Sequence, residues 1–165
     1  MKTIIFFTGP QCSGKSHLAG MLGRYFDIPV LHIGKKLRKR HTVTEFIDSN
    51  SLVSAPACMD EEVERMIVAF LLSCAGPFCF VDSFPRNARQ RGWLRAYSLD
   101  HFDERVLVVF VTAPLYVRFR RYLSRTKFSM SNMHYFIKRE WQDKYELKRL
   151  FSLPVLFPII KINNR

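Results

Sequence analysis

The chain has four cysteines, and their spacing suits neither a metal nor a redox centre. Cys12, Cys58, Cys74 and Cys79 form no C-x-x-C pair and no zinc-finger spacing. We therefore expect reduced thiols and a cytoplasmic location. No apolar stretch approaches the roughly 18 residues of a membrane span, so no transmembrane helix is predicted. Internal repeats and low-complexity linkers are also absent, and the length of 165 residues predicts a single domain.

Acidic residues are scarce as well. The sequence has 14 Asp and Glu against 26 Lys and Arg, which gives a net charge of +12. Such a chain attracts anionic partners, which include nucleotides, nucleic acids and membrane surfaces, and the charge alone does not choose among them. The densest basic run is Lys-Lys-Leu-Arg-Lys-Arg-His at 35–41. It predicts the start of a helix, with either a solvated face or a nucleic-acid patch.

The most informative stretch is the first 25 residues. Residues 3–8 are apolar, β-branched and aromatic, as in a strand. Residues 9–16, Gly-Pro-Gln-Cys-Ser-Gly-Lys-Ser, match G-x-x-x-x-G-K-[ST] at every position, and Leu18 and Leu22 follow at helical spacing. A strand, this motif and a helix, in that order, predict a phosphate-binding P-loop. The same context argues against a signal peptide.

These residue types suit the phosphates of a nucleotide. Gly9 and Gly14 lack a Cβ, so the loop can bring backbone N–H groups close to a phosphate. The helix that follows adds the positive end of its dipole. Lys15 can reach the outer phosphates, and the Ser16 hydroxyl can hold Mg²⁺, so we expect ATP and Mg²⁺ as ligands. The predicted phosphate-binding residues are Gly9, Pro10, Gln11, Cys12, Ser13, Gly14, Lys15 and Ser16.

The rest of the chain alternates strand and helix patterns. Further strands are predicted within 27–33 and at 78–81, 106–111 and 159–162, and further helices start at 35, 60, 87, 114 and 136. The order β-α-β-α-α-β-α-β-α-α-β predicts an α/β fold of three layers, the P-loop NTPase fold, with a five-stranded parallel sheet and helices on both faces. Asp82 ends the strand 78–81, at the edge where such sheets bind ligands, so we expect it to hold hydrated Mg²⁺ together with Ser16.

Two helices late in the chain carry explicit side-chain expectations. After Pro114, the spacing of Leu115, Phe119, Tyr122 and Leu123 predicts that these residues face inward, with Arg118, Arg120, Arg121 and Arg125 elsewhere. In the helix 136–150, Ile137, Trp141 and Tyr145 recur four residues apart. Residues 126–133, between the two helices, are polar and short.

Further motifs, in order, resemble the adenylate kinase family of nucleoside-monophosphate kinases. Residues 81–86, Val-Asp-Ser-Phe-Pro-Arg, followed by Gln90, resemble the family's D-G-[FY]-P-R-x-x-x-Q. Residues 33–38, Ile-Gly-Lys-Lys-Leu-Arg, are similar to T-G-D-x-L-R. Three further segments are similar to family motifs. Residues 59–63 resemble P-D-E-x-V, and residues 121–125 resemble the R-x-x-x-R before the lid. Residues 138–145 resemble the K-R-x-x-x-Y-Y helix after the lid. The resemblance covers residues 3–162.

The resemblance implies transfer of the γ-phosphate of Mg·ATP to a nucleoside monophosphate, with AMP as the favoured acceptor. It implies one domain over residues 1–165, with an acceptor-binding segment at about 34–75 and a short lid at about 125–134. Arg38 and Arg86 would clamp the acceptor phosphate beside Gly34, and Gln90 would hydrogen-bond the acceptor base. The implied catalytic residues are Lys15, Arg86, Arg121, Arg125 and Arg139. The expected partners are nucleotides, with no membrane, and the expected state is a monomer.

The sequence also departs from the family pattern. Ser83 replaces a glycine, Ile33 a threonine and Lys35 an acidic residue, the lid lacks R-x-D-D, and the chain stops before the family's last helix. These departures keep two alternatives open. One is a P-loop kinase for CMP, dCMP or a non-nucleotide acceptor. The other is a nucleotide-binding protein with weak turnover that binds RNA or a protein through its basic surface.

Overall fold

The computed structural model describes residues 1–40, 57–126, 129–152 and 157–164. Its strands are β1 (Thr3–Thr8), β2 (Val30–His32), β3 (Phe78–Asp82), β4 (Arg105–Thr112) and β5 (Ile159–Asn163). Its helices are α1 (Lys15–Tyr25), α2 (Ile33–Arg40), α4 (Ala57–Ser73), α5 (Ala88–Asp100), α6 (Leu115–Leu123) and α7 (Met130–Ser152). The predicted order of strands and helices is confirmed.

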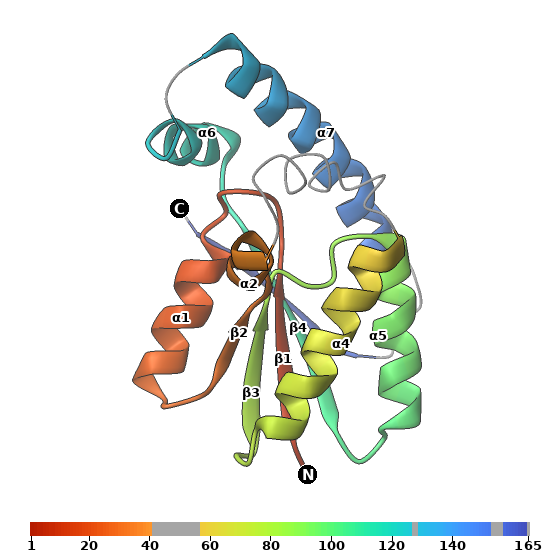
Figure 1. Ribbon diagram of the computed structural model, residues 1–165. Coiled ribbons are helices and arrows are strands. Elements are labelled where there is room, and N and C mark those ends of the chain that lie inside the picture. The colour runs from red at the N-terminus through yellow and green to blue at the C-terminus, as the bar shows by residue number, and fades with distance from the viewer. Residues whose placement is uncertain (41–56, 127–128, 153–156, 165) are drawn as a thin grey trace.

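The five strands form one parallel sheet in the order β2-β3-β1-β4-β5 (Figure 1). In the central strand β1, Ile5 is in register with Phe80 of β3 and with Leu107 of β4. β1 is apolar on both faces because both are buried, as the continuous apolar run predicts. The predicted α/β fold with a five-stranded parallel sheet is therefore confirmed.

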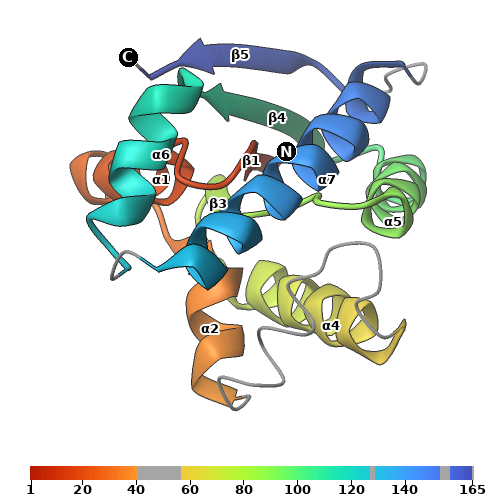
Figure 2. The ribbon, with the colours of Figure 1, turned by 90° about the horizontal axis from the view of Figure 1, so that it is seen from above.

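Helices cover both faces of this sheet (Figure 2). On one face, Ile4 and Phe6 belong to a core cluster that includes Ile67 of α4 and Leu94 of α5. On the other face, Phe7, Val109 and other strand residues pack with Ala19 of α1. The helices α6 and α7 lie beyond the carboxyl ends of the strands, so they face the edge at which α/β proteins bind ligands (Figure 1).

The topology places the P-loop at the centre of that edge. From β1 the chain passes through α1 to the outer strand β2, and β3 then returns to pair with β1 on the same side. β4 and β5 lie on the other side of β1, so the strand order reverses beside β1. A reversal of this kind leaves a crevice at the carboxyl end of the central strands, where ligands bind.

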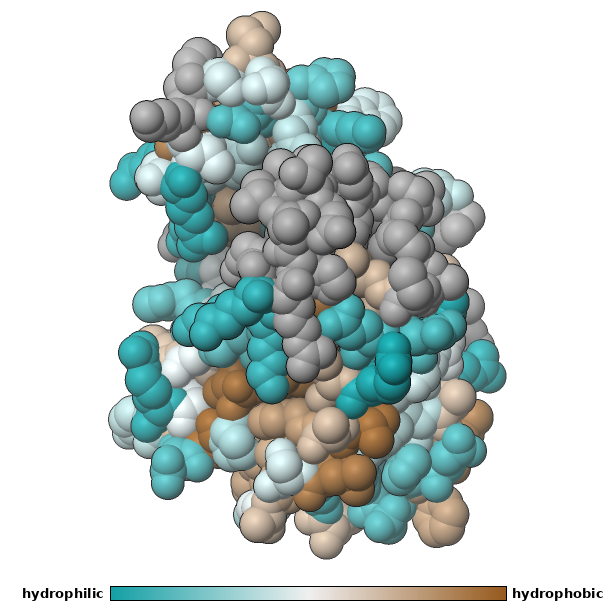
Figure 3. Space-filling view, in the orientation of Figure 1, coloured by the Kyte–Doolittle hydropathy of each residue, from teal (hydrophilic) through white to brown (hydrophobic). Residues whose placement is uncertain are grey.

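On the face shown in Figure 3, the described residues are mainly hydrophilic, with an apolar area in the lower half. This area corresponds to α4, where Val68 and Leu72 have exposed fractions of 39% and 83%. The buried side of α4 holds Val63, Ile67 and Leu71. Among the described helices, none is both long and apolar enough to cross a membrane.

The boundaries of α7 differ from the prediction. The helix begins at Met130 rather than Phe136. Residues 130–134 of the expected lid (125–134) are therefore helical, and residues 127–128 lie outside the described part of the chain. Ser129 explains the early start, because its hydroxyl accepts a hydrogen bond from the Asn132 backbone N–H at 3.1 Å, as an N-terminal cap does.

The orientation of α6 follows the prediction at Tyr122, which is buried, and at Arg120, which is exposed, but it differs at two other residues. Leu115, expected inward, is 54% exposed, whereas Arg118, expected elsewhere, is only 6% exposed. The guanidinium of Arg118 donates to the Ala113 carbonyl at 2.9 Å and forms a two-pronged ion pair with Glu140 of α7. A bidentate, charge-assisted pair of this kind outweighs the burial of one leucine.

The side of α7 that faces the protein combines the buried Phe136 with several ion pairs and charged hydrogen bonds. Glu140 pairs with Arg118, and Glu146 pairs with Arg91 of α5 at 3.0 Å. Between them, Asp143 accepts a hydrogen bond from the backbone N–H of Gln11 in the P-loop at 2.8 Å. The apolar residues that predicted this helix therefore face solvent, with exposed fractions of 50% for Ile137, 74% for Trp141 and 56% for Tyr145.

Candidate functional site

A cavity of about 500 Å³ opens at the carboxyl edge of the sheet. The P-loop and Asp82 lie on its floor, and residues from α2, α6 and α7 complete its walls. Its lining residues are Gln11, Cys12, Lys15, Ser16, His32, Gly34, Lys35, Asp82, Ser83, Arg86, Tyr122, Arg125, Thr126, Tyr135 and Arg139. Five of these are lysine or arginine, and Asp82 is the one carboxylate among them, so the cavity suits a polyanion.

The P-loop backbone requires its two glycines. Gly9 has φ 140° and Gly14 has φ 93°, both in the region that side chains disfavour. A Cβ on Gly9 would lie 2.0 Å from the Val111 carbonyl oxygen, and one on Gly14 would lie 2.2 Å from Nδ2 of Asn164. The buried Ser13 hydroxyl has no hydrogen-bond partner among the described residues. This orphaned donor lies in the loop that the sequence assigns to phosphates, so the residues present fit a polyphosphate.

Lys15 is the first residue of α1 and is only 6% exposed. Its ammonium group donates to the Pro10 carbonyl at 3.0 Å, across the loop. Burial, with Arg86 nearby, lowers the pKa of Lys15 to about 8. Burial disfavours the charged form of Lys15, so a bound anion would stabilise this ammonium group in place of the water it has lost.

Two side chains brace the P-loop from outside the cavity. Nη1 of Arg121 lies within hydrogen-bond distance of the Cys12 and Ser13 carbonyls, at 3.5 and 3.4 Å. Nδ2 of Asn164 donates to the same Ser13 carbonyl at 3.0 Å. Arg121, predicted as catalytic, therefore does not line the cavity in this structure. Asn164 follows the last strand and carries no motif, so the sequence offered no sign of its role.

The residues expected to hold Mg²⁺ both line the cavity. Asp82 is 2% exposed and ends β3, and Ser16 lies in the first turn of α1. A carboxylate and a hydroxyl fit Mg²⁺, which prefers oxygen ligands and keeps several waters. Among the described residues, no three His, Cys, Asp or Glu side chains gather into a metal cage.

His32 contacts this carboxylate and was missed by the sequence analysis. Its Nδ1 lies 3.0 Å from Oδ2 of Asp82, and the Ser83 hydroxyl donates to Oδ1 at 3.2 Å. Both contacts hold the orientation of a carboxylate that is nearly inaccessible to solvent. The register of β2 with β3 places His32 directly opposite Asp82. That pairing connects residues 50 positions apart, which sequence periodicity does not reveal.

The arginines expected to act on the phosphates occupy different places. Arg86 and Arg139 line the cavity, and Arg139 is only 4% exposed. Burial and the neighbouring Arg139 charge lower the pKa of Arg86 to about 10, which leaves Arg86 charged at neutral pH. Arg125 also lines the cavity but is exposed to solvent. The structure thus brings Arg86, Arg125 and Arg139 together with Lys15.

Of the residues predicted to bind the acceptor, some line the cavity and others do not. Gly34 lines the cavity, and Arg38 lies in α2 with its side chain outside the described part of the chain. Gln90 is 6% exposed and does not line the cavity. Its Oε1 accepts from the Arg86 backbone N–H at 2.8 Å, and its Nε2 donates to Asp60 at 2.8 Å. In this structure, Gln90 therefore positions the backbone of Arg86.

Ser83 has φ 74°, in the left-handed region that favours glycine. Glycine at this position avoids the clash of the Cβ, which explains the preference of the family pattern. We predict that Ser83→Gly is more stable than Ser83→Ala by about 1 kcal/mol, because both lose the hydroxyl but only glycine relieves the backbone. Urea unfolding of the two variants measures the difference. Equal stabilities would show that the Ser83 backbone is unstrained.

No protein-family model and no curated protein matches the sequence. Solved structures do match. TT1252 from Thermus thermophilus is 21% identical with a TM-score of 0.56, and the match covers 99% of this chain and 90% of that one. A candidate kinase from Chloroflexus aurantiacus is 16% identical with a TM-score of 0.61, over 98% of this chain and 85% of that one. At these identities the likeness concerns the fold, and the chain therefore has the three-layer α/β P-loop fold.

Proposed function

We propose that the protein is an ATP-dependent phosphotransferase of the adenylate kinase type. It moves the γ-phosphate of Mg·ATP to a nucleoside monophosphate, with AMP as the first candidate acceptor. One observation carries the proposal, namely that Lys15, Arg86 and Arg139 converge on one cavity whose floor is the P-loop and Asp82. Two phosphorylated substrates can meet only where several cations offset their charge.

The reaction needs positioning more than covalent chemistry. An oxygen of the acceptor phosphate forms a bond to the γ-phosphorus, and the bond from that phosphorus to the β–γ bridging oxygen breaks. The products are ADP and the nucleoside diphosphate. The attacking phosphate is already an anion, so no general base is required, and we assign none.

The proposed roles follow from where each side chain lies. The P-loop backbone and Lys15 hold the donor phosphates, and Ser16 and Asp82 would hold Mg²⁺, which neutralises phosphate charge when bound. Arg86 and Arg139 contact the transferred and acceptor phosphates. Arg125, exposed at the cavity mouth, closes over them when substrates bind. Arg121 acts from behind the loop, as a positioning residue.

In this proposal, the preference for one acceptor base depends on Gln90 and on residues that line the cavity. Both amide atoms of Gln90 are engaged in intramolecular bonds, so a base-reading role for Gln90 requires those bonds to exchange. Lys35 and Ser83 line the cavity where the family pattern has an acid and a glycine. These differences favour testing CMP and dCMP beside AMP.

The test is a coupled assay of ADP release with Mg·ATP and a panel of AMP, CMP, dCMP, UMP, GMP and dAMP. We expect turnover on at least one monophosphate, and Lys15→Ala should abolish it. ATP binding is measured separately by calorimetry. Binding of ATP without turnover on any acceptor would contradict the kinase proposal, whereas turnover on CMP or dCMP alone would replace AMP as the acceptor.

A further inference from the structure

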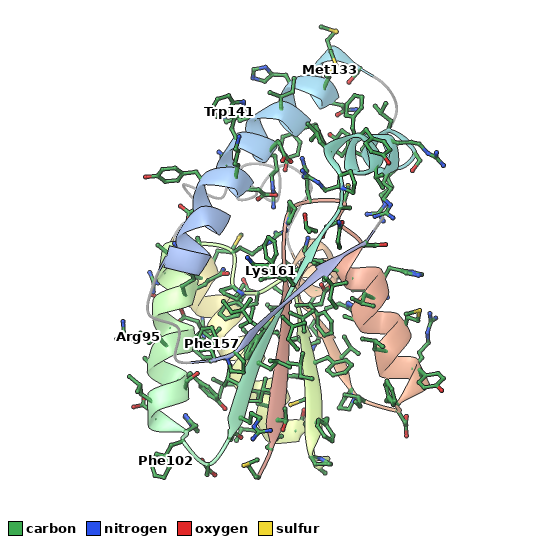
Figure 4. The ribbon with its side chains drawn as sticks, turned by 180° about the vertical axis from the view of Figure 1, so that it is seen from behind. Arg95, Phe102, Met133, Trp141, Phe157 and Lys161 are labelled. Atoms are coloured by element: carbon green, nitrogen blue, oxygen red, sulfur yellow. The ribbon has the colours of Figure 1, made fainter. Side chains whose placement is uncertain are left out.

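The side of α7 that faces solvent has an unusual composition. Its five residues Ile137, Lys138, Trp141, Lys144 and Tyr145 are all exposed, and we call them the outer face of α7. Figure 4 shows Trp141 pointing away from the sheet. The exposed tryptophan and tyrosine lie one helical turn apart and together offer an aromatic surface to a ligand.

The charge of the outer face is uniformly positive. The three acidic residues of α7 all face the protein instead. Glu140 pairs with Arg118, and Glu146 pairs with Arg91. Asp143 accepts a hydrogen bond from the Gln11 backbone N–H. Asp143 and Glu146 are 7% and 9% exposed. Within the described residues, the acids of α7 therefore turn away from the two lysines and the aromatic rings, in a chain of net charge +12.

We propose that the outer face of α7 binds single-stranded nucleic acid. Trp141 and Tyr145 lie about 6 Å apart along the helix axis, and both rings can stack on unpaired bases. Lys138 and Lys144 flank the rings and can contact the phosphates between the bases. Aromatic platforms combined with cations are what single strands require, because every base has a π face.

Two other occupants fit this face less well. Interfacial membrane helices bury a broad apolar face, whereas here the apolar residues form a single line with lysines on either side. A second copy of the chain would bring the same lysines against each other, and like charges across an interface are unfavourable. The proposal is independent of the kinase proposal, since the outer face points away from the cavity and shares no residue with its lining.

The probe is a fluorescein-labelled oligouridylate of about 12 nucleotides, titrated at about 50 mM salt. We expect Trp141→Ala to weaken binding by about tenfold. The matched control is Phe102→Ala, since Phe102 is 89% exposed and lies at the opposite end of the molecule (Figure 4). Lys138→Gln with Lys144→Gln should reduce the slope of log affinity against log salt by about 1.4. Thermal melts of each variant establish that it is folded.

A second measurement follows Trp141 directly. Trp93 is the other tryptophan of the chain, so a Trp93→Phe background leaves Trp141 as the only one. Oligouridylate should quench its fluorescence. Equal affinities of Trp141→Ala and Phe102→Ala would overturn the proposal, because binding would then be diffuse attraction to a basic surface. If only the double variant Lys36→Gln with Lys39→Gln loses affinity for oligouridylate, the site lies on α2 instead. A response of Trp141 to phosphatidylserine vesicles but not to oligouridylate would identify a membrane face.

Discussion

Replacing Arg86 with glutamine is expected to lower turnover on the order of 10³-fold. The Arg86 side chain lines the cavity beside Arg139 and Lys15, where the proposed reaction would require charge on the transferred phosphoryl group to be stabilised. Glutamine keeps a hydrogen-bonding amide but removes the charge and the planar fork that fits phosphate oxygens. A coupled assay at saturating Mg·ATP measures the change.

The same variant should not lower the thermal midpoint. Within the described part of the chain, the Arg86 guanidinium forms no ion pair, and both burial and Arg139 disfavour its charge. Removing the charge therefore relieves a cost in the ligand-free protein. Arg95→Gln is the matched control, because Arg95 lies exposed on α5, away from the cavity. A fall in both turnover and midpoint would show that Arg86 is structural, and a loss below about tenfold would remove it from the chemistry.

The second large effect concerns the pair that joins α6 to α7. Glu140→Gln should destabilise the protein by about 3–5 kcal/mol, because it leaves the buried guanidinium of Arg118 without its counter-charge. For a chain of this size the thermal midpoint would fall by roughly 6–20 °C. The Arg118 side chain is 8% exposed and that of Glu140 is 24% exposed, so solvent replaces the lost partner poorly. Urea unfolding and thermal melts measure both quantities.

A double variant separates the pair from the packing around it. Arg118→Met with Glu140→Leu should recover much of the lost stability, because apolar replacements of a buried pair are often neutral. The control is Glu61→Gln, which breaks an exposed ion pair with Arg89 at 3.0 Å. That change should leave the midpoint within experimental error, because solvent screens exposed ion pairs. Equal effects of Glu140→Gln and Glu61→Gln would mean that burial adds nothing.

The conformation of the P-loop segment was predictable because its residues are contiguous. The strand 3–8, the glycines at 9 and 14 and the helix from Lys15 form one local unit, and its conformation follows from residue type. Asp82 was predictable for a related reason. It ends a buried parallel strand, and every parallel strand delivers its last residue to the same edge of the sheet.

The apolar spacing in α6 and α7 was correctly interpreted as helical, but it misled on which side of α7 faces the protein and on Leu115 in α6. Ile137, Trp141 and Tyr145 form a regular stripe, yet they face solvent. The deciding partners, Arg91 and Arg118, belong to α5 and α6, so no window of α7 contains them. Once two arginines are buried, their carboxylates must face inward, since an unpaired buried charge costs more than exposed apolar surface.

The sequence by itself therefore determined the order of strands and helices, the P-loop, and the position of Asp82 at the carboxyl edge of the sheet. Periodicity and local turn chemistry encode these features. Only the tertiary structure decided which arginines enter the cavity, that Gln90 positions Arg86, and that Asn164 and Arg121 brace the loop. These roles depend on hydrogen bonds and ion pairs between residues distant in the chain. Such contacts are selected by three-dimensional packing and charge balance, which residue spacing does not record.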